Sequence, residues 1–361
     1  MNYKDRWTEV ALKLEDLKLG LINESAQKEA FVERPKKIVS VLQNFKHSSN
    51  HGILVYSISK VIGGDEKISL FSGLTADFLG DAIRTYDNIV EVRESERKSH
   101  SPLFGLDSYE LVCIYTTLLM LANRCMNEIS KDKTGERFDR LSEAILNFPY
   151  LSIPDKTREK LKTLPQTKTA DIIVDRISDY GKILGLIAAI PVAHSMKQIN
   201  LSANVGKKFC AGMHLTDEVH DFLDGTDVSA KKFGNYVFSQ LTSFSSPQDR
   251  ALLKEYMTSA SVTEKNVRTI IMMAINNGAL DSVMNTVQGY MNMSKKNFLQ
   301  MTSFKDLKSK EFVVETFDYV ADVIGRTMKA YHSDVSYIDR LKHLPRRNVL
   351  QSRMFCSYFV E

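Results

Sequence analysis

The sequence is poor in the residues that make tight turns. Its 361 residues include only 17 glycines and 8 prolines. A sheet-rich protein needs many tight turns, so this shortage favours long helices. The 4 cysteines form no CxxC pair, and no spacing typical of a zinc site is present. We therefore expect reduced thiols that are buried or idle.

Long apolar runs and a strong net charge are also missing. The longest apolar run, residues 183–193, is about half of the roughly 20 residues that a membrane span needs, and Pro191 interrupts it. We expect a buried core helix there and no integral membrane segment. The charged N-terminal stretch lacks the apolar centre of a signal peptide, which predicts a cytoplasmic protein. A net charge of +4 is too balanced to favour nucleic-acid binding.

Helical periodicity is present over nearly the whole chain. Apolar residues recur at three- and four-residue spacing, and there is almost no period-two alternation, repeat or low-complexity linker. We predict an all-α fold with a single main domain, a helix bundle over residues 30–328. A helical segment precedes it over 1–29, and a basic tail follows over 329–361. The predicted helices span residues 38–45, 70–92, 111–129, 172–196, 205–223, 266–291 and 312–328.

Two of these helices carry acidic stripes among apolar residues. On the first, Asp87 and Glu91 are four residues apart and share a face, with Asn88 beside them. Carboxylates at this spacing repel each other by a few tenths of a kcal/mol, so a compensating cation is expected.

The second stripe consists of Asp217, Asp221 and Asp224, which also share one helix face. Taken singly, either stripe is explained by a solvated acidic surface. Taken together in one all-α chain, they favour a metal site. Oxygen ligands without a set of histidines and cysteines suit Mg²⁺, which commonly bridges carboxylates to phosphate oxygens.

The second stripe resembles a motif of the trans-isoprenyl diphosphate synthases and of the class I terpene synthases that share their fold. The stretch Asp217-Glu-Val-His-Asp221 resembles their DDxxD motif. It is followed by Gly225-Thr-Asp227 and Lys231-Lys-Phe-Gly234, which resemble the family's glycine–aspartate turn and LGK. Asp87-Asn-Ile-Val-Glu91 is similar to the other aspartate-rich motif. The resemblance covers about residues 30–328, and it implies a bundle around a central active-site cavity.

The resemblance also implies a site and its ligands. It implies three Mg²⁺ ions, with Mn²⁺ as an alternative, an allylic prenyl diphosphate substrate and a homodimer. The implied catalytic residues are Asp87, Asp217 and Arg97. The implied metal ligands are Asp87, Asn88, Glu91, Asp217, Glu218 and Asp221. The implied diphosphate-binding residues are Arg97, Lys98, Arg176 and Lys231, although Arg176 is equally explained by a surface salt bridge to Asp175 or Asp179.

The sequence departs from the family where chain-elongating members bind isopentenyl diphosphate. Those members use a Lys and an Arg of a GKRxRP motif and a His seven residues before the first aspartate motif. Here these positions are Phe31, Val32 and Gly80, and the Lys that follows the second motif is Gln240. Each lost charged hydrogen bond would cost about 1.5–3 kcal/mol.

We therefore predict a Mg-dependent terpene synthase, a lyase that ionises one allylic diphosphate without adding an isopentenyl unit. The small Ala82 before the first motif indicates a substrate of C15 or longer by the same resemblance. Two alternatives stay open. One is a prenyltransferase that condenses an allylic diphosphate with isopentenyl diphosphate, with Lys36 or Lys37 replacing the missing groups. The other is a catalytically weak partner subunit of such an enzyme.

Overall fold

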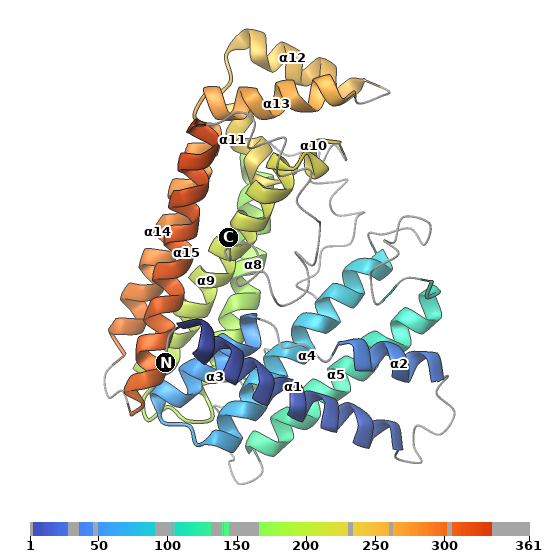
Figure 1. Ribbon diagram of the computed structural model, residues 1–361, viewed down its shortest axis with the longest axis vertical. Helices are drawn as coiled ribbons and strands as arrows, with labels where there is room; N and C mark the ends of the chain where they lie inside the picture. Colours follow the sequence, from blue (N-terminus) through green and yellow to red (C-terminus); the bar gives the residue numbers. More distant parts are fainter. Residues whose placement is uncertain are drawn as a thin grey trace.

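The protein is all-α over the residues that its structure, a computed structural model, describes (Figure 1). This confirms the predicted fold class. In this part of the chain no helix is long and apolar enough to cross a membrane. The described residues are 3–27, 36–45, 50–90, 103, 105–130, 139, 141–143, 166–229, 234–259, 263–301 and 305–333.

Long helices form the centre of the bundle. In chain order they are α3 (Asn50–Ile62), α4 (Glu66–Val90), α5 (Ser108–Ser130), α8 (Gln166–Ala189) and α9 (Met196–Leu223). The helix α8 packs on both α4 and α9, so the two helices with the acidic stripes share a neighbour. Buried apolar residues from all five helices belong to one continuous core.

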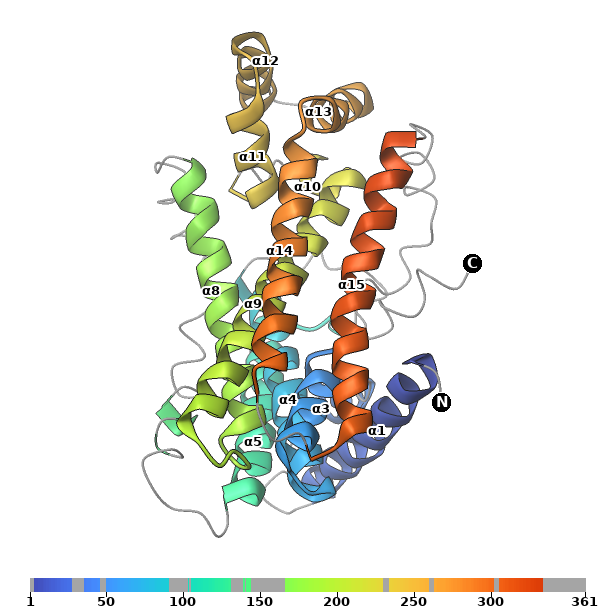
Figure 2. The ribbon, with the colours of Figure 1, turned by 90° about the vertical axis from the view of Figure 1, so that its left-hand side faces the viewer.

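The remaining helices surround this centre. Figure 2 shows α14 and α15 as two long helices side by side, and α12 and α13 lie at one end of the molecule, next to α11. The outer helices are α1 (Tyr3–Gln27), α2 (Lys36–Asn44), α10 (Thr226–Ser229), α11 (Tyr236–Phe244), α12 (Pro247–Thr258), α13 (Glu264–Asn276), α14 (Ala279–Leu299) and α15 (Leu307–Ser333).

Two predicted helices end earlier than the sequence pattern indicated. The expected helix over 266–291 is divided into α13 and α14 at Asn277 and Gly278, where Gly278 has φ of +80°. Glycine adopts this left-handed conformation without strain, and it stops the helix. Similarly, α8 ends at Ala189, two residues before Pro191, because proline lacks an N–H and disfavours helical geometry in the residue before it.

The N-terminal helix is part of the bundle core, although we predicted its residues as a separate segment. On α1, the side chain of Lys18 is fully buried, and its Nζ lies 2.7 Å from an oxygen of Asp81 on α4. The ammonium group also lies 5.5 Å from the ring centroid of Phe78. Trp7 and Leu14 join the same apolar core. A buried charge is costly unless it is paired, so this ion pair fixes α1 on α4.

The helices α8 and α9 approach each other so closely that their backbones touch. A Cβ atom placed on Gly181 would lie 2.1 Å from the carbonyl oxygen of Gly206, and one on Gly185 would lie 2.1 Å from that of Ser202. The Ser202 hydroxyl donates a hydrogen bond of 2.8 Å to the Gly185 carbonyl oxygen. Only glycine permits this contact, because any side chain would push the helices apart.

We expect Gly206→Ala to destabilise the protein. Its new methyl group would lie 2.0 Å from the Gly181 carbonyl oxygen, and overpacking of this kind costs about 1–3 kcal/mol. Gly289→Ala on α14 is the matched control, because nothing lies within 4 Å of its Cβ position. That variant should be more stable than the wild type by up to about 1 kcal/mol. Urea denaturation of both variants measures the difference. Equal stability of Gly206→Ala and the wild type would contradict the close crossing.

Candidate functional site

The C-terminal end of α9 carries the second acidic stripe. The helix ends at Leu223, and the N–H of the next residue, Asp224, donates to the carbonyl oxygen of His220 at 2.9 Å. Gly225 follows with φ of +81°, a left-handed turn that glycine adopts without strain. The glycine–aspartate turn expected from the sequence is therefore present, and it connects α9 to α10.

Asp217 is the most electrostatically unusual residue of this stripe. Its side chain is accessible to water, yet desolvation by the surrounding protein is the main cause that raises its pKa to about 7. His214 opposes this rise, and the negative charges of Asp221 and Glu218 add to it. The Asp217 carboxyl group is therefore in contact with water, although neighbouring protein atoms partly desolvate it. Near neutral pH such a group is only partly ionised, and a bound cation would favour its ionised form.

Glu218, expected as a metal ligand, makes contacts that hold α9 against α11. It is buried, and one carboxylate oxygen accepts the N–H of Tyr236 at 2.8 Å. The other oxygen lies 3.1 Å from Nε2 of His214. Both oxygens thus have protein partners, while Asp217 and Asp221 lie on the neighbouring face of the helix.

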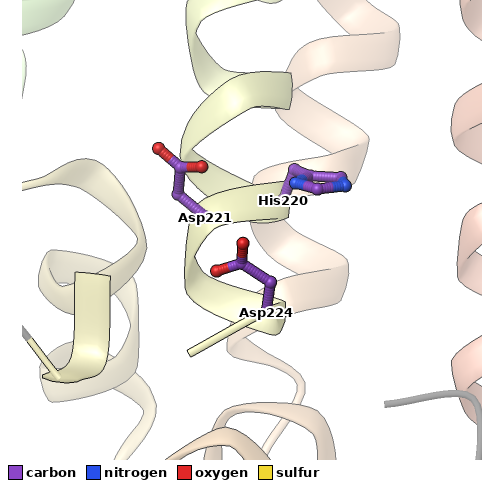
Figure 3. Close-up of side chains that lie close together, drawn as sticks. All are labelled: His220, Asp221 and Asp224. Atoms are coloured by element: carbon purple, nitrogen blue, oxygen red, sulfur yellow. The ribbon is translucent and has the colours of Figure 1, made fainter. Parts of the chain in front are cut away.

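His220, Asp221 and Asp224 lie together on the last turn of α9 (Figure 3). One ligand atom from each side chain falls within 4.8 Å of the others, close enough for the three to hold a metal ion. Desolvation lowers the pKa of His220, which keeps its ring neutral, and Asp224 opposes this effect. Sequence reasoning missed this group, although the spacing of His220 and Asp224, four residues apart, could have indicated it.

The segment after α9 is fixed by a buried polar contact. The carboxylate of Asp227 is buried and accepts a hydrogen bond of 2.9 Å from the side-chain amide of Asn235. The amide oxygen of Asn235 accepts the N–H of Phe238 at 2.9 Å and so caps α11. Asp227, part of the glycine–aspartate turn, is thereby used to position α11.

The first acidic stripe lies at the C-terminal end of α4. The side-chain amide of Asn88 donates to the carbonyl oxygen of Arg84 at 2.8 Å, one turn back on the same helix. Asp87 is part of α4, but its side chain lies outside what the structure describes, as does the whole of Glu91. The structure thus places this stripe on a helix that packs on α8, as α9 does, and leaves the two expected acidic ligands as predictions.

The predicted diphosphate-binding residues fall mostly outside the described residues. Arg97, Lys98 and Lys231 belong to undescribed segments. Arg176 lies on α8, but the structure does not describe its side chain. All four assignments remain predictions.

The position of the missing histidine, Gly80, is covered by an aromatic side chain. A Cβ atom on Gly80 would lie 3.2 Å from the hydroxyl oxygen of Tyr180, which reaches α4 from α8. Tyr180 is buried, and desolvation raises its pKa well above the usual value. The ring of His51 on α3 packs edge-on against it, with ring centroids 5.4 Å apart. Three helices therefore meet at Gly80, where the sequence resemblance led us to look for a histidine, and a side chain larger than glycine would displace Tyr180.

Gln240 stands at the position of the Lys that the sequence resemblance led us to expect after the second motif. Gln240 accepts a hydrogen bond of 3.1 Å from the Ser282 hydroxyl, which connects α11 with α14.

Burial raises the pKa values of the Cys125 and Cys210 thiols to about 12, so both remain protonated and unreactive. The expectation of buried thiols is confirmed for these two cysteines.

No family model matches the sequence, and no curated protein matches it. Solved structures share its fold. A decaprenyl diphosphate synthase from Rhodobacter capsulatus superposes with a TM-score of 0.69 at 14% identity, over 89% of this chain and 99% of that one. A geranylgeranyl pyrophosphate synthetase from Geoglobus acetivorans gives 0.64 at 16% identity, over 88% and 98%. A polyprenyl synthase from Caulobacter crescentus, complexed with calcium and isoprenyl diphosphate, gives 0.67 at 16% identity, over 88% and 97%.

These likenesses confirm the fold that the sequence resemblance implied. They extend over nearly the full length of each compared chain, so the arrangement of helices is shared with the whole of these three structures. At 14–16% identity the shared feature is the arrangement of helices, and the chemistry has to be argued from the side chains.

We expect the stability of the protein to fall between pH 7 and pH 5 because of His51. Burial, with a smaller effect of Arg84, lowers the native pKa of His51 to about 4. The unfolded chain binds a proton near pH 6.5, so the stabilisation is complete above that pH and is lost as the pH falls toward 4. The loss from this residue between pH 7 and pH 5 is about 2 kcal/mol.

Urea denaturation at the two pH values, compared between wild type and His51→Gln, isolates this contribution. The variant should lose less stability than the wild type over the same interval. An identical loss in both proteins would show that His51 titrates normally in the folded state.

Proposed function

We propose that this protein is a Mg-dependent terpene synthase, which ionises an allylic prenyl diphosphate of C15 or longer and releases diphosphate. The observation that carries the proposal is the state of α9: Asp217 and Asp221 share a face, water reaches Asp217, and its pKa is raised to about 7. Two carboxylates on one helix face repel each other and destabilise the helix. A cation that binds to both would remove this repulsion and so explain why the pair is present.

The donor atoms at this site fit Mg²⁺. Asp217 and Asp221 supply carboxylate oxygens on one helix face, and Asp87, Asn88 and Glu91 would supply further oxygens from α4 and the segment after it. The solved polyprenyl synthase from Caulobacter crescentus binds calcium together with isoprenyl diphosphate, which supports a divalent ion and a diphosphate in this fold. Bound Mg²⁺ would neutralise the diphosphate and make it a better leaving group.

In the proposed mechanism the chain's own residues bind and orient the substrate. Arg97, Lys98, Arg176 and Lys231 would donate charge-assisted hydrogen bonds to the diphosphate oxygens. Glu218 acts as a positioning residue, because it accepts the N–H of Tyr236 and so holds α9 against α11, while His214 on the same helix contacts its other oxygen. Departure of diphosphate leaves an allylic cation, which needs an apolar environment that excludes water.

The contact between Gly80 and Tyr180 favours a terpene synthase over a chain-elongating prenyltransferase. Elongation needs a second diphosphate beside the first, and its negative charge requires donors. At Gly80 the structure instead has the hydroxyl group of Tyr180, a single neutral group on a buried ring that packs against His51. A partner subunit without its own activity is the remaining alternative, and Asn88 in the place of an acidic ligand favours it.

The proposed reaction is tested with the purified protein, Mg²⁺ and allylic diphosphates of increasing length, each with and without isopentenyl diphosphate. We expect a hydrocarbon or alcohol product from an allylic diphosphate alone, detected by gas chromatography with mass spectrometry. Asp217→Ala should reduce turnover by several orders of magnitude, because it removes a metal ligand from the reacting site.

The other outcomes separate the alternatives. A longer diphosphate that forms only when isopentenyl diphosphate is present would establish the prenyltransferase and refute the terpene synthase. Activity that appears only after a partner synthase is added would establish that the protein is a catalytically weak partner subunit. Unchanged turnover in Asp217→Ala would refute the metal assignment.

We also propose that the protein forms a homodimer, in the cytoplasm, through α5. Tyr109, Val112 and Met120 fall on one face of this helix, with 73%, 46% and 53% of their surfaces exposed. Exposed large apolar side chains in a row are typical of a protein interface.

Met120→Glu should weaken or abolish the dimer, because it places a charge within the apolar face of α5. Sedimentation velocity measures the change, and Met293→Glu on α14, where the methionine is 46% exposed, is the matched control. A wild type that sediments as a monomer would refute the dimer.

A further inference from the structure

A group of side chains with metal-ligating atoms lies beside the proposed Mg²⁺ ligands, at the end of α9. The side chains of His220, Asp221 and Asp224 each bring one ligand atom within 4.8 Å of the other two. Ligand atoms around a divalent ion lie about 3–4 Å apart, because each bond is about 2.1 Å long. Binding of one ion by all three side chains would therefore need new rotamers of His220 and Asp221, but no movement of the helix.

The surroundings of this group favour a cation. His220 and Asp221 lie in the last turn of a 28-residue helix and Asp224 is its C-cap, where the carbonyl groups that end the helix carry partial negative charge. Both ring nitrogens of His220 are shielded from solvent, and one ligand atom of the ring lies within 4.8 Å of a ligand atom of each carboxylate. A solvent-shielded imidazole next to two acids combines the donor types of a metal centre, and the carboxylates alone would repel each other.

The imidazole also selects the kind of ion. Mg²⁺ prefers oxygen ligands, whereas an imidazole nitrogen with two carboxylates suits Zn²⁺, Co²⁺ and related ions. We propose that His220, Asp221 and Asp224 form a binding site for a borderline divalent cation such as Zn²⁺ or Co²⁺, distinct from the set around Asp217. The two sets share Asp221, so an ion at this site competes with Mg²⁺ for that carboxylate and regulates the proposed reaction. The regulatory role rests on the proposed function, but the binding site does not.

The test uses the full-length, metal-free protein without diphosphate and with Co²⁺ as the probe. Isothermal titration calorimetry should give about one tight Co²⁺ per chain, and visible absorption should show the bands of a nitrogen-ligated ion. Excess Mg²⁺ should not displace it. His220→Gln should weaken Co²⁺ binding about 100-fold, since loss of a partner behind a ligand already costs 10–100-fold. Asp224→Asn should weaken it as well.

His214→Gln is the matched control, because His214 lies on the same helix but contacts Glu218 instead. It should bind Co²⁺ as the wild type does, and so should Asp217→Asn. Circular dichroism confirms that each variant is folded. The proposal is overturned if the wild type binds no Co²⁺, if His220→Gln binds it equally well, or if Mg²⁺ displaces it readily. None of these results depends on turnover, so failure of the terpene synthase reaction leaves this test intact.

Discussion

The close crossing of α8 and α9 is the constraint on which the rest of the molecule depends. Because Gly181 and Gly185 have no side chains, the backbone of α9 lies directly against that of α8. This contact determines where the end of α9 lies, and therefore where Asp217 and Asp221 lie. It also determines where Tyr180, the residue before Gly181, reaches α4 and covers Gly80. The contact between these two backbones thus fixes both the acidic stripe of α9 and the place of Tyr180 against Gly80.

Charged groups are used in two different ways in this structure. Lys18 and Asp81 are buried and paired at 2.7 Å, so each compensates the other and the contact holds helices together. Asp217 has the opposite arrangement: desolvation by the surrounding protein raises its pKa to about 7, and its neighbours Asp221 and Glu218, which carry the same charge, add to this rise. Removing one partner of a buried pair costs about 3–5 kcal/mol, so the contact between Lys18 and Asp81 belongs to the fold. Among the acids of α9, Glu218 has a similar role in helix packing, whereas we propose that Asp217 and Asp221 bind a cation.

Much of the fold could be predicted from the sequence, because helical periodicity is a local property. The ends of α5 and the C-terminal end of α9 follow from the apolar pattern, whereas α9 begins nine residues earlier than predicted, at Met196. The left-handed Gly225 follows from the glycine itself. The pattern did not show the break at Gly278, because the apolar spacing continues across it. It also gave no sign of the burial of Lys18, which depends on a residue 63 positions away.

The candidate site was predictable only in part. Residues four apart on one helix share a face, so the relation between Asp217 and Asp221 could be read from the sequence, as could the pairing of His220 with Asp224. The covering of Gly80 by Tyr180 could not, because it depends on how α8 crosses its neighbours. Likewise, the sequence could not show that Glu218 turns toward Tyr236 and away from its acidic neighbours.

The contacts of α1 with α15 have a consequence for biosynthesis. Tyr3 stacks on Phe312 with ring centroids 5.3 Å apart, and Arg6 donates to the carbonyl oxygen of Lys308 at 3.2 Å. A ribosome adds about 5–20 residues per second, so α1 waits some tens of seconds for these partners. During that time α1 can pack on α2, α3 and α4, which are made soon after it, and only the residues that contact α15 lack their partners. The first helix to be made is thus among the last to be completed.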